Sequence, residues 1–480
     1  CKASYNLGCT YFKMNLLNKA TKTFKKTIKL DPKLINSYNN LAQAYLLTGK
    51  FNQAIKIYQK AIRNKPEDMK TYSNFLFALN YTHNLSAEEI YKSYQEFDKR
   101  FCVPLKVKWK PFAQPKEPNK KLKIGYVSPD FRKHSMVNLL RPVLENHNKD
   151  QFEVFAFSEL AKEDYVTKCY KSFADHWIST IGLSDQALAN KVRSLGIDIL
   201  IDLAGHTQGN RLGAFMYKPA PVSVSCFGFG YTTGLSAIDY FLSDSILTPK
   251  GSEHLFTEKL LYLSNQCVVF SPKLDMGPVG PLPALENNFI TFGTLSRSIR
   301  LNKHVIKAWS NILHRVKNSK LVINSISFKG KETTAKLKSL FLSHGITKDR
   351  LELSLESPPW DTMRRIDIAL DCFPHNSGVT LLEHIYMGNP FITLASRPSV
   401  GRIGSSYLTS IGHPEWITNT EEEYVAKAVS LASDINKLSD IRSSLRGEAQ
   451  NSVLMNDKLF TVKIEKAYKD IWNHYYLSTI

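Results

Sequence analysis

Three loops that follow predicted strands carry side chains that could take part in catalysis or ligand binding. The first is Ser128-Pro-Asp-Phe-Arg-Lys-His134, the second is Asp202-Leu-Ala-Gly-His206-Thr207, and the third runs from Asp371 to Thr380. His134 and His206 are candidates for general acid–base chemistry, because imidazole changes its charge near neutral pH. A lone histidine is more often structural, but two at the strand ends of one lobe favour a functional site.

The third loop leads into a helix and predicts an anion site. Ser377, Gly378, Val379 and Thr380 stand where the helix begins, and the backbone N–H groups of Ser377 and Gly378 should face outward there. Such groups, together with the helix dipole, suit a diphosphate. Glu383 lies one turn beyond Thr380 and could accept hydrogen bonds from ribose hydroxyls. An ordinary capped helix would show the same pattern.

Two arginines follow the first strand of the second lobe. Arg297 and Arg300 could neutralise phosphate oxygens, because guanidinium binds them bidentately, although surface arginines would look the same. No Asp-x-Asp metal motif occurs in the sequence. We therefore expect arginine and the helix dipole, rather than a metal ion, to meet the charge of a leaving group.

These loops must be positioned by an alternation of strands and helices that begins at Lys121. The pattern predicts one α/β lobe with strands at 122–127, 152–157, 197–203 and 222–227, and a helix at 184–195. A Pro- and Gly-rich stretch at 272–283 marks a boundary. A second lobe follows, with predicted strands at 288–292, 320–324, 351–355, 366–370 and 391–394 and helices at 302–315, 333–344 and 380–387. The alternation indicates two doubly wound parallel sheets, in which ligands bind outside the carboxyl ends of the strands.

The first 80 residues repeat with a period of 34. Leucine, tyrosine, alanine, aromatic, isoleucine and proline positions recur in register: Leu7/Leu41, Tyr11/Tyr45, Ala20/Ala54, Phe24/Tyr58, Ile28/Ile62 and Pro32/Pro66. This is the pattern of tetratricopeptide repeats, an all-α solenoid in which each helix pair covers the apolar face of its neighbour. A third unit begins at Tyr72 and drifts from the pattern, as a capping repeat does.

One polar position recurs in all three units. Asn6, Asn40 and Asn74 each precede the Leu or Phe position on the first helix of a unit. Because an amide both donates and accepts hydrogen bonds, a ladder of amides can hold the backbone of an extended peptide. We expect acceptor peptides to bind along this face.

The segment after the repeats leads to the first lobe. Residues 82–101 predict an amphipathic helix with Ser86 and Glu89 as a capping box. Residues 102–120 contain Pro104, Pro111, Pro115 and Pro118 and predict a linker. The expected domains are repeats at 1–101, linker at 102–120, a catalytic lobe at 121–280 and a nucleotide-sugar-binding lobe at 281–480.

Composition excludes several classes of protein. The hydrophobic content of 43% suits packed cores, and no apolar run reaches the roughly 18–20 residues that span a bilayer. Seven dispersed cysteines without a C-x-x-C pair indicate reduced thiols in the cytoplasm, not a disulfide framework or a zinc site. The chain opens Cys-Lys-Ala-Ser-Tyr, so we expect it to be a fragment with an unseen native N-terminus.

The charge is concentrated in the first quarter of the chain. Residues 1–123 hold 24 Lys/Arg against 8 Asp/Glu, within a net charge of +20 for the whole chain. Such a surface could attract nucleic acid, a membrane or acidic polypeptide. Lysine-rich helices without interleaved arginine or aromatic residues have little recognition specificity, so a solvated helix face is favoured, and neither membrane nor nucleic-acid binding is expected.

Ordered motifs across the chain resemble the O-linked N-acetylglucosamine transferase family, including its SPINDLY-like branch. They are Lys123-Ile-Gly-Tyr-Val-Ser-Pro-Asp-Phe131, Asp202-Leu-Ala-Gly-His-Thr207, Pro219-Ala-Pro-Val222, Ile238-Asp-Tyr240 and Asp367-Ile-Ala-Leu-Asp371. The resemblance implies a glycosyltransferase B-type fold, inversion at the anomeric carbon, no metal, and Ser/Thr side chains of proteins as acceptors.

The resemblance also assigns roles to residues. His134 falls on the family's active-site histidine, and Asp202 and His206 fall on a strand-end pair near the sugar and the acceptor. Thr380 and Glu383 fall on the diphosphate and ribose positions. Arg300 stands where the family usually has a catalytic lysine, and Gly378 stands where the animal enzymes carry histidine.

The expected reaction is direct displacement by an acceptor hydroxyl. Arg300 and the helix start at Ser377–Thr380 would stabilise the negative charge on the departing nucleotide. We expect this electrostatic stabilisation of the transition state to contribute more to the rate than any one proton acceptor. His134, His206 and Asp202 are all possible proton acceptors. UDP-N-acetylglucosamine is the expected donor; GDP-fucose, a catalytically impaired repeat scaffold and nucleic-acid binding through the basic repeats are the alternatives.

Overall fold

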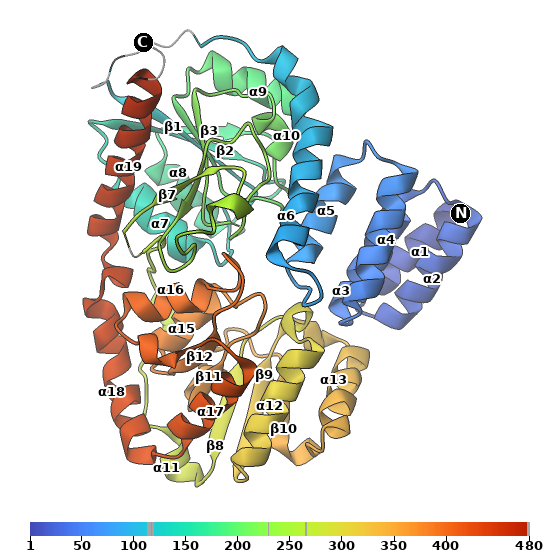
Figure 1. Ribbon diagram of the computed structural model, residues 1–480, viewed down its shortest axis with the longest axis vertical. Helices are drawn as coiled ribbons and strands as arrows, with labels where there is room; N and C mark the ends of the chain where they lie inside the picture. The colour runs from blue at the N-terminus through green and yellow to red at the C-terminus, as the bar shows by residue number, and fades with distance from the viewer. Residues whose placement is uncertain (113–116, 118–119, 229, 265, 478–480) are drawn as a thin grey trace. The chain divides into compact units, whose positions relative to one another are not determined.

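The computed structural model describes all 480 residues except 113–116, 118–119, 229, 265 and 478–480 (Figure 1). The chain forms two compact units, each built from separate stretches. The first unit comprises Cys1–Asn84 and Leu274–Ala449, and the second comprises Leu85–Lys273 and Gln450–Ile480. The four-part domain division stays a prediction, although the first unit joins the repeats to much of the second lobe.

The repeats form a run of antiparallel helices, coloured blue in Figure 1. Small Ala20 and Ala54 are fully buried and let helices approach closely, and Phe24 and Tyr58 fill the space beside them. Asp68 caps the fifth helix by accepting from the backbone N–H of Thr71. The helices are α1 (Lys2–Lys13), α2 (Leu17–Leu30), α3 (Ile35–Leu47), α4 (Phe51–Asn64) and α5 (Met69–Leu79).

The remainder of the first unit is a parallel sheet with helices on its faces. Its strand order is β10-β9-β8-β11-β12-β13. The strands are β8 (Ile290–Thr294), β9 (Ser319–Asn324), β10 (Leu351–Ser354), β11 (Ile368–Leu370), β12 (Phe391–Leu394) and β13 (Ile417–Thr418). The helices are α11 (Pro283–Asn287), α12 (Lys303–Arg315), α13 (Lys331–Ser343), α14 (Trp360–Arg364), α15 (Val379–Tyr386), α16 (Ile403–Ser410), α17 (Glu421–Ala432) and α18 (Ile435–Asn451).

The second unit holds a larger parallel sheet, with strand order β3-β2-β1-β4-β5-β6-β7. The strands are β1 (Leu122–Ser128), β2 (Phe152–Ser158), β3 (His176–Ser179), β4 (Ile199–Asp202), β5 (Val222–Ser225), β6 (Tyr240–Ser243) and β7 (Lys259–Tyr262). The helices are α6 (Ala87–Phe97), α7 (Val137–Asn146), α8 (Tyr165–Phe173), α9 (Asp185–Ser194), α10 (Leu212–Phe215) and α19 (Asp457–Leu477). Phe460, Ile464 and Tyr468 of α19 join the core of this sheet.

The predicted fold class is confirmed: helical repeats precede two doubly wound parallel sheets. Strands β4 and β5 are buried along their whole length, and the nearly continuous apolar run before Asp202 made β4 recognisable from the sequence. The half-exposed strands β3 and β7 lacked that signal and were missed, and so were the mostly buried β6 and the two-residue β13.

The segment between the repeats and β1 differs from its prediction. Helix α6 begins only at Ala87, because Ser86 and Glu89 form the predicted capping box there. A π-helix (Asp98–Cys102) ends the predicted helix, and a 3-10 helix (Val103–Lys108) lies within the predicted linker. Pro115 and Pro118 lie outside the described residues. Across the described residues, no helix is both long and apolar enough to cross a membrane.

Candidate functional site

The predicted site loops of the first unit lie where the strand order of its sheet reverses. Strands β8 and β11 are parallel neighbours, with Phe292 opposite Ile368 and Gly293 opposite Ala369. The chain leaves β8 toward Arg297 and Arg300 and leaves β11 toward Asp371. Ligands of open α/β sheets bind outside the carboxyl ends of strands at such a switch point.

Asp371 holds the loop of residues 371–380. Its Oδ1 accepts from the backbone N–H of Ser377 at 2.8 Å and of Cys372 at 2.7 Å, and its Oδ2 accepts from the Thr393 hydroxyl at 2.7 Å. Burial raises the pKa of Asp371 to about 6, and these hydrogen bonds oppose the rise. The carboxylate thus fixes the path of the chain into α15.

Ser377 corrects one expectation. Its N–H points inward to Asp371, so the prediction that this N–H faces outward is wrong. Its hydroxyl hydrogen bonds to that of Ser296, which ties the loop to the segment after β8. Gly378 instead lies at the open start of α15: a Cβ there would meet no described atom within 4 Å.

Arg297 directly precedes a 3-10 turn, Ser298–Arg300, and Arg300 is the last residue of that turn. The Nε of Arg300 donates to the carbonyl oxygen of Asn376 at 3.1 Å, which places the guanidinium beside the 371–380 loop. Arg297 keeps an exposed side chain, yet the protein around it and the charge of Arg300 lower its pKa. The charges of both arginines act on His375, so positive charge gathers beside the 371–380 loop, in a region suited to a diphosphate.

The remaining predicted donor residues lie on the first turns of α15. Val379 is buried, Thr380 is partly exposed and Glu383 is 6% exposed. The structure therefore brings Arg300, Gly378, Val379, Thr380 and Glu383 into one region of the first unit. Their contacts with a donor stay predictions.

The second unit repeats this arrangement at its own switch point. Strands β1 and β4 are parallel neighbours, with Val127 opposite Asp202, so the loops that follow them leave the same edge of the sheet. The two loops touch, because a Cβ at Gly209 would lie 2.8 Å from the Cβ of Pro129. His134, Asp202 and His206 belong to this edge.

Asp202 and His206 are buried and hydrogen bonded. Asp202 accepts from the backbone N–H groups of Ala204 and Gly205 and, at 2.8 Å, from the hydroxyl of Ser225. The Nε2 of His206 lies 2.8 Å from the carbonyl oxygen of Thr233, which can only accept, so this nitrogen carries a proton. Burial lowers the pKa of His206 to about 4, and the imidazole is neutral near pH 7.

His134 is the more accessible of the two histidines. Its side chain is 36% exposed, and its Nδ1 lies 3.7 Å from an oxygen of Asp130. A carboxylate at that distance can orient an imidazole and stabilise its protonated form. The catalytic roles of His134, Asp202 and His206 stay predictions.

The asparagine ladder lies on the first helices of the three repeats, as predicted. Asn6 is exposed on α1, whereas the Nδ2 of Asn40 on α3 donates toward the Tyr5 hydroxyl at 3.3 Å. The Nδ2 of Asn74 on α5 donates to Asn39 at 3.4 Å. These bonds link neighbouring repeats, and the role of the ladder in peptide binding stays a prediction.

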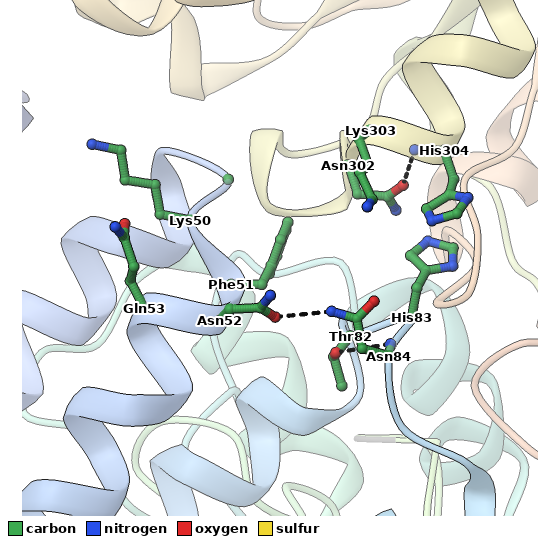
Figure 2. A pocket seen from close by; sticks show the side chains of 11 residues that line it. Lys50, Phe51, Asn52, Gln53, Thr82, His83, Asn84, Asn302, Lys303 and His304 are labelled. Carbon is green, nitrogen blue, oxygen red and sulfur yellow. Dashed lines mark hydrogen bonds between the residues drawn. The ribbon is translucent and has the colours of Figure 1, made fainter.

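The sequence did not indicate a pocket of about 390 Å³ in the first unit (Figure 2). The start of α4, the segment after α5 and the start of α12 line it. Figure 2 shows the imidazoles of His83 and His304 face to face, with centroids 4.4 Å apart. His83 follows the third repeat unit, which drifts from the 34-residue pattern. That drift was the only sequence signal that the segment after α5 packs differently from the other repeats.

The comparisons with known proteins agree on one family. Residues 99–273 and 283–464 match the model of glycosyl transferase family 41, and residues 2–34 and 35–68 each match a tetratricopeptide repeat model. The O-GlcNAc transferase of Thermobaculum terrenum, solved as a mutant, has a TM-score of 0.93 and 30% identity. That match covers 100% of this chain and 92% of the solved one.

Two plant relatives bear related names. A protein of Oryza sativa subsp. japonica, named probable UDP-N-acetylglucosamine–peptide N-acetylglucosaminyltransferase SPINDLY, is 33% identical over 408 residues, which are 83% of this chain and 44% of the relative. An Arabidopsis thaliana protein with the same enzyme name, SEC, is 30% identical over 374 residues, which are 74% of this chain and 37% of the relative. The chain thus spans less than half the length of these relatives. By the extent of these matches, the chain belongs to glycosyl transferase family 41.

Proposed function

We propose that this protein transfers N-acetylglucosamine from UDP-N-acetylglucosamine to serine or threonine side chains of other proteins. One observation carries the proposal. Arg300 donates a hydrogen bond to the Asn376 carbonyl of the 371–380 loop, which leads into the open start of α15 at Gly378. Family membership and the names of the relatives support the donor, and nothing among them favours GDP-fucose. The repeats supply a surface for a protein acceptor.

The proposed reaction is a metal-independent, inverting displacement. The acceptor hydroxyl attacks the anomeric carbon as the bond to the nucleotide diphosphate breaks, and the diphosphate leaves with the bonding electrons. Arg300 and the first N–H groups of α15 would stabilise this growing negative charge, which is larger in the transition state than in the bound donor. Arginine in place of the family lysine retains the positive charge and adds a fork of donors.

The acceptor hydroxyl must also lose its proton. Asp202 and His206 are 1% and 2% exposed and are engaged in hydrogen bonds within the fold, which suits them to hold the loop after β4. His134 is partly exposed and has Asp130 nearby, so we assign it the proton acceptor role. We further propose a cytoplasmic location, which the seven dispersed cysteines, without a C-x-x-C pair, support.

Ligand-induced thermal stabilisation tests the donor. A ligand present at about 100 times its Kd stabilises the folded protein by about 2.7 kcal/mol, so UDP and UDP-N-acetylglucosamine should raise the melting temperature. GDP and GDP-fucose at the same concentration should have no such effect. A larger shift with the guanine nucleotides would overturn the donor assignment, and no shift with any nucleotide would favour a scaffold without catalysis.

A further inference from the structure

The segment that ends the third repeat lies against the 371–380 loop. The ring of Tyr81 is 3% exposed and stacks on the imidazole of His375, with centroids 4.6 Å apart and planes inclined by 14°. The guanidinium carbon of Arg300 lies 5.9 Å from the centre of the same ring. One side chain of the repeats therefore contacts two groups of the proposed donor site.

A single carbonyl joins these two groups. The Asn376 oxygen lies 2.8 Å from the Nδ1 of His375 and accepts from the Nε of Arg300 at 3.1 Å. Burial lowers the pKa of His375 well below its usual value, with the charges of Arg300 and Arg397 acting in the same direction. The ring is consequently neutral near pH 7 and can lie beside a guanidinium group without electrostatic repulsion.

His83 makes a second connection two residues further along the chain. Its Nε2 lies 3.0 Å from the carbonyl oxygen of Phe373, which also accepts from the Nδ2 of Asn302 at 2.6 Å. Because a carbonyl only accepts, the Nε2 of His83 donates. One face of the His83 imidazole stacks on the imidazole of His304, as Figure 2 shows.

Carbonyl groups at the carboxyl ends of α3 and α5 also bind side chains near the 371–380 loop and the Ser298–Arg300 turn. Arg397 donates to the carbonyl oxygens of Thr82 at 2.8 Å and Asn80 at 2.5 Å, just beyond α5, where the helix dipole favours a cation. The last residue of α3, Leu47, accepts from the hydroxyl of Ser298 at 3.2 Å. Ser298 belongs to the turn that carries Arg300.

We propose that Tyr81, a residue of the repeats, is a positioning residue for nucleotide binding: its ring holds His375 and thereby orients Arg300 through the Asn376 carbonyl. The proposal rests on the proposed function, because it assumes that Arg300 meets the donor diphosphate. Loss of the ring would leave the His375 face without its stacking partner and free the loop that places the Arg300 guanidinium. The positive charge of Arg300, no longer held in place, would then bind the nucleotide less tightly.

Calorimetric titration of the full chain with UDP tests this inference. Tyr81→Leu should raise the Kd for UDP about tenfold, which is about 1.4 kcal/mol, since it removes both the stacked ring and its positioning of Arg300. Tyr81→Phe keeps the ring and should bind UDP as the wild type does. Tyr58→Leu removes another buried tyrosine of the repeats, on α4, and should lower the melting temperature while leaving the Kd unchanged.

Should Tyr81→Leu fail to fold, His83→Phe provides a second variant. It keeps an aromatic ring against His304 but removes the hydrogen bond to Phe373, and it should also weaken UDP binding. Equal Kd values for the wild type and the foldable variant would overturn the role of this segment, as would equal weakening by Tyr58→Leu. A wild type that binds no UDP would instead overturn the proposed function, and this inference with it.

Discussion

At the scale of single residues, the side chains of the predicted site divide into those that can meet a ligand and those that hold the loops. Arg300 and Gly378 lie at the open start of α15, whereas Ser377 and Asp371 are hydrogen bonded inside the loop. In the second unit, His206 is enclosed by the rings of Tyr94 and Phe97. Residue type alone did not distinguish these roles, because each depends on burial and on partners distant in sequence.

Arg300 should dominate catalysis. Arg300→Ala removes a charge that, in the proposed reaction, stabilises the leaving diphosphate, and a single electrostatic contact of this kind contributes about 100- to 1,000-fold to the rate. We expect kcat/KM for UDP-N-acetylglucosamine to fall by that factor, while Arg300→Lys retains much of the activity. Steady-state kinetics with a peptide acceptor would measure both. Full activity in Arg300→Ala would contradict the proposed role.

The pKa of His206 predicts a pH-dependent stability. Its folded-state pKa of about 4 lies below the ordinary value of 6.5, so the unfolded chain takes up the proton first as the pH falls. The wild type should therefore lose stability through this group between pH 6.5 and 4, a contribution that His206→Gln lacks. The advantage of the wild type over this variant should shrink by about 2 kcal/mol between about pH 7 and about pH 4.5. Urea unfolding would measure it, and an advantage independent of pH would contradict a buried neutral imidazole.

Glycines at two positions should respond differently to alanine. Gly378 has a negative φ of −106° and open space where a Cβ would be, so Gly378→Ala should change the stability by less than about 0.5 kcal/mol. At Gly293 on β8, a Cβ would lie 2.3 Å from the Cδ1 of Ile366, and Gly293→Ala should cost about 1–3 kcal/mol. Thermal unfolding of the two variants checks this contrast. Equal destabilisation would show that the start of α15 is not open.

At the scale of elements, the 371–380 loop depends on one buried carboxylate. Asp371→Ala would leave the N–H of Ser377 without its acceptor, and a buried group left unsatisfied costs about 1–3 kcal/mol. We expect a matching loss of stability together with weaker UDP binding. Asp371→Asn keeps an acceptor oxygen in the same place and serves as the control. If Asp371→Ala bound UDP as tightly as Asp371→Asn, the loop would not depend on this residue.

The elements themselves were largely predictable. The 34-residue period revealed the repeats because Ala20, Ala54 and their neighbours must pack identically in each unit. The site loops were found because buried strands end visibly at Asp202 and Asp371. The contacts of Tyr81 and His83 were not predictable, because they join segments nearly 300 positions apart, and no local pattern encodes such packing.

At the scale of the whole molecule, the repeats and the proposed donor site belong to one compact unit. Contacts such as that of Asn18 with Glu332 extend this connection to the first repeat. The surface proposed for a protein acceptor therefore belongs to the same unit as the residues proposed to bind the nucleotide diphosphate. This organisation is what the proposed transfer of a sugar to proteins requires.

The most direct test is transfer itself. The purified protein would be incubated with UDP-N-acetylglucosamine and a library of Ser- and Thr-containing peptides, and the products would be read by mass spectrometry, with Arg300→Ala as the matched control. We predict peptides that gain one N-acetylhexosamine on serine or threonine with the wild type and a far smaller yield with the variant. Peptides that stay unmodified while UDP is bound, or equal yields from both proteins, would contradict the account.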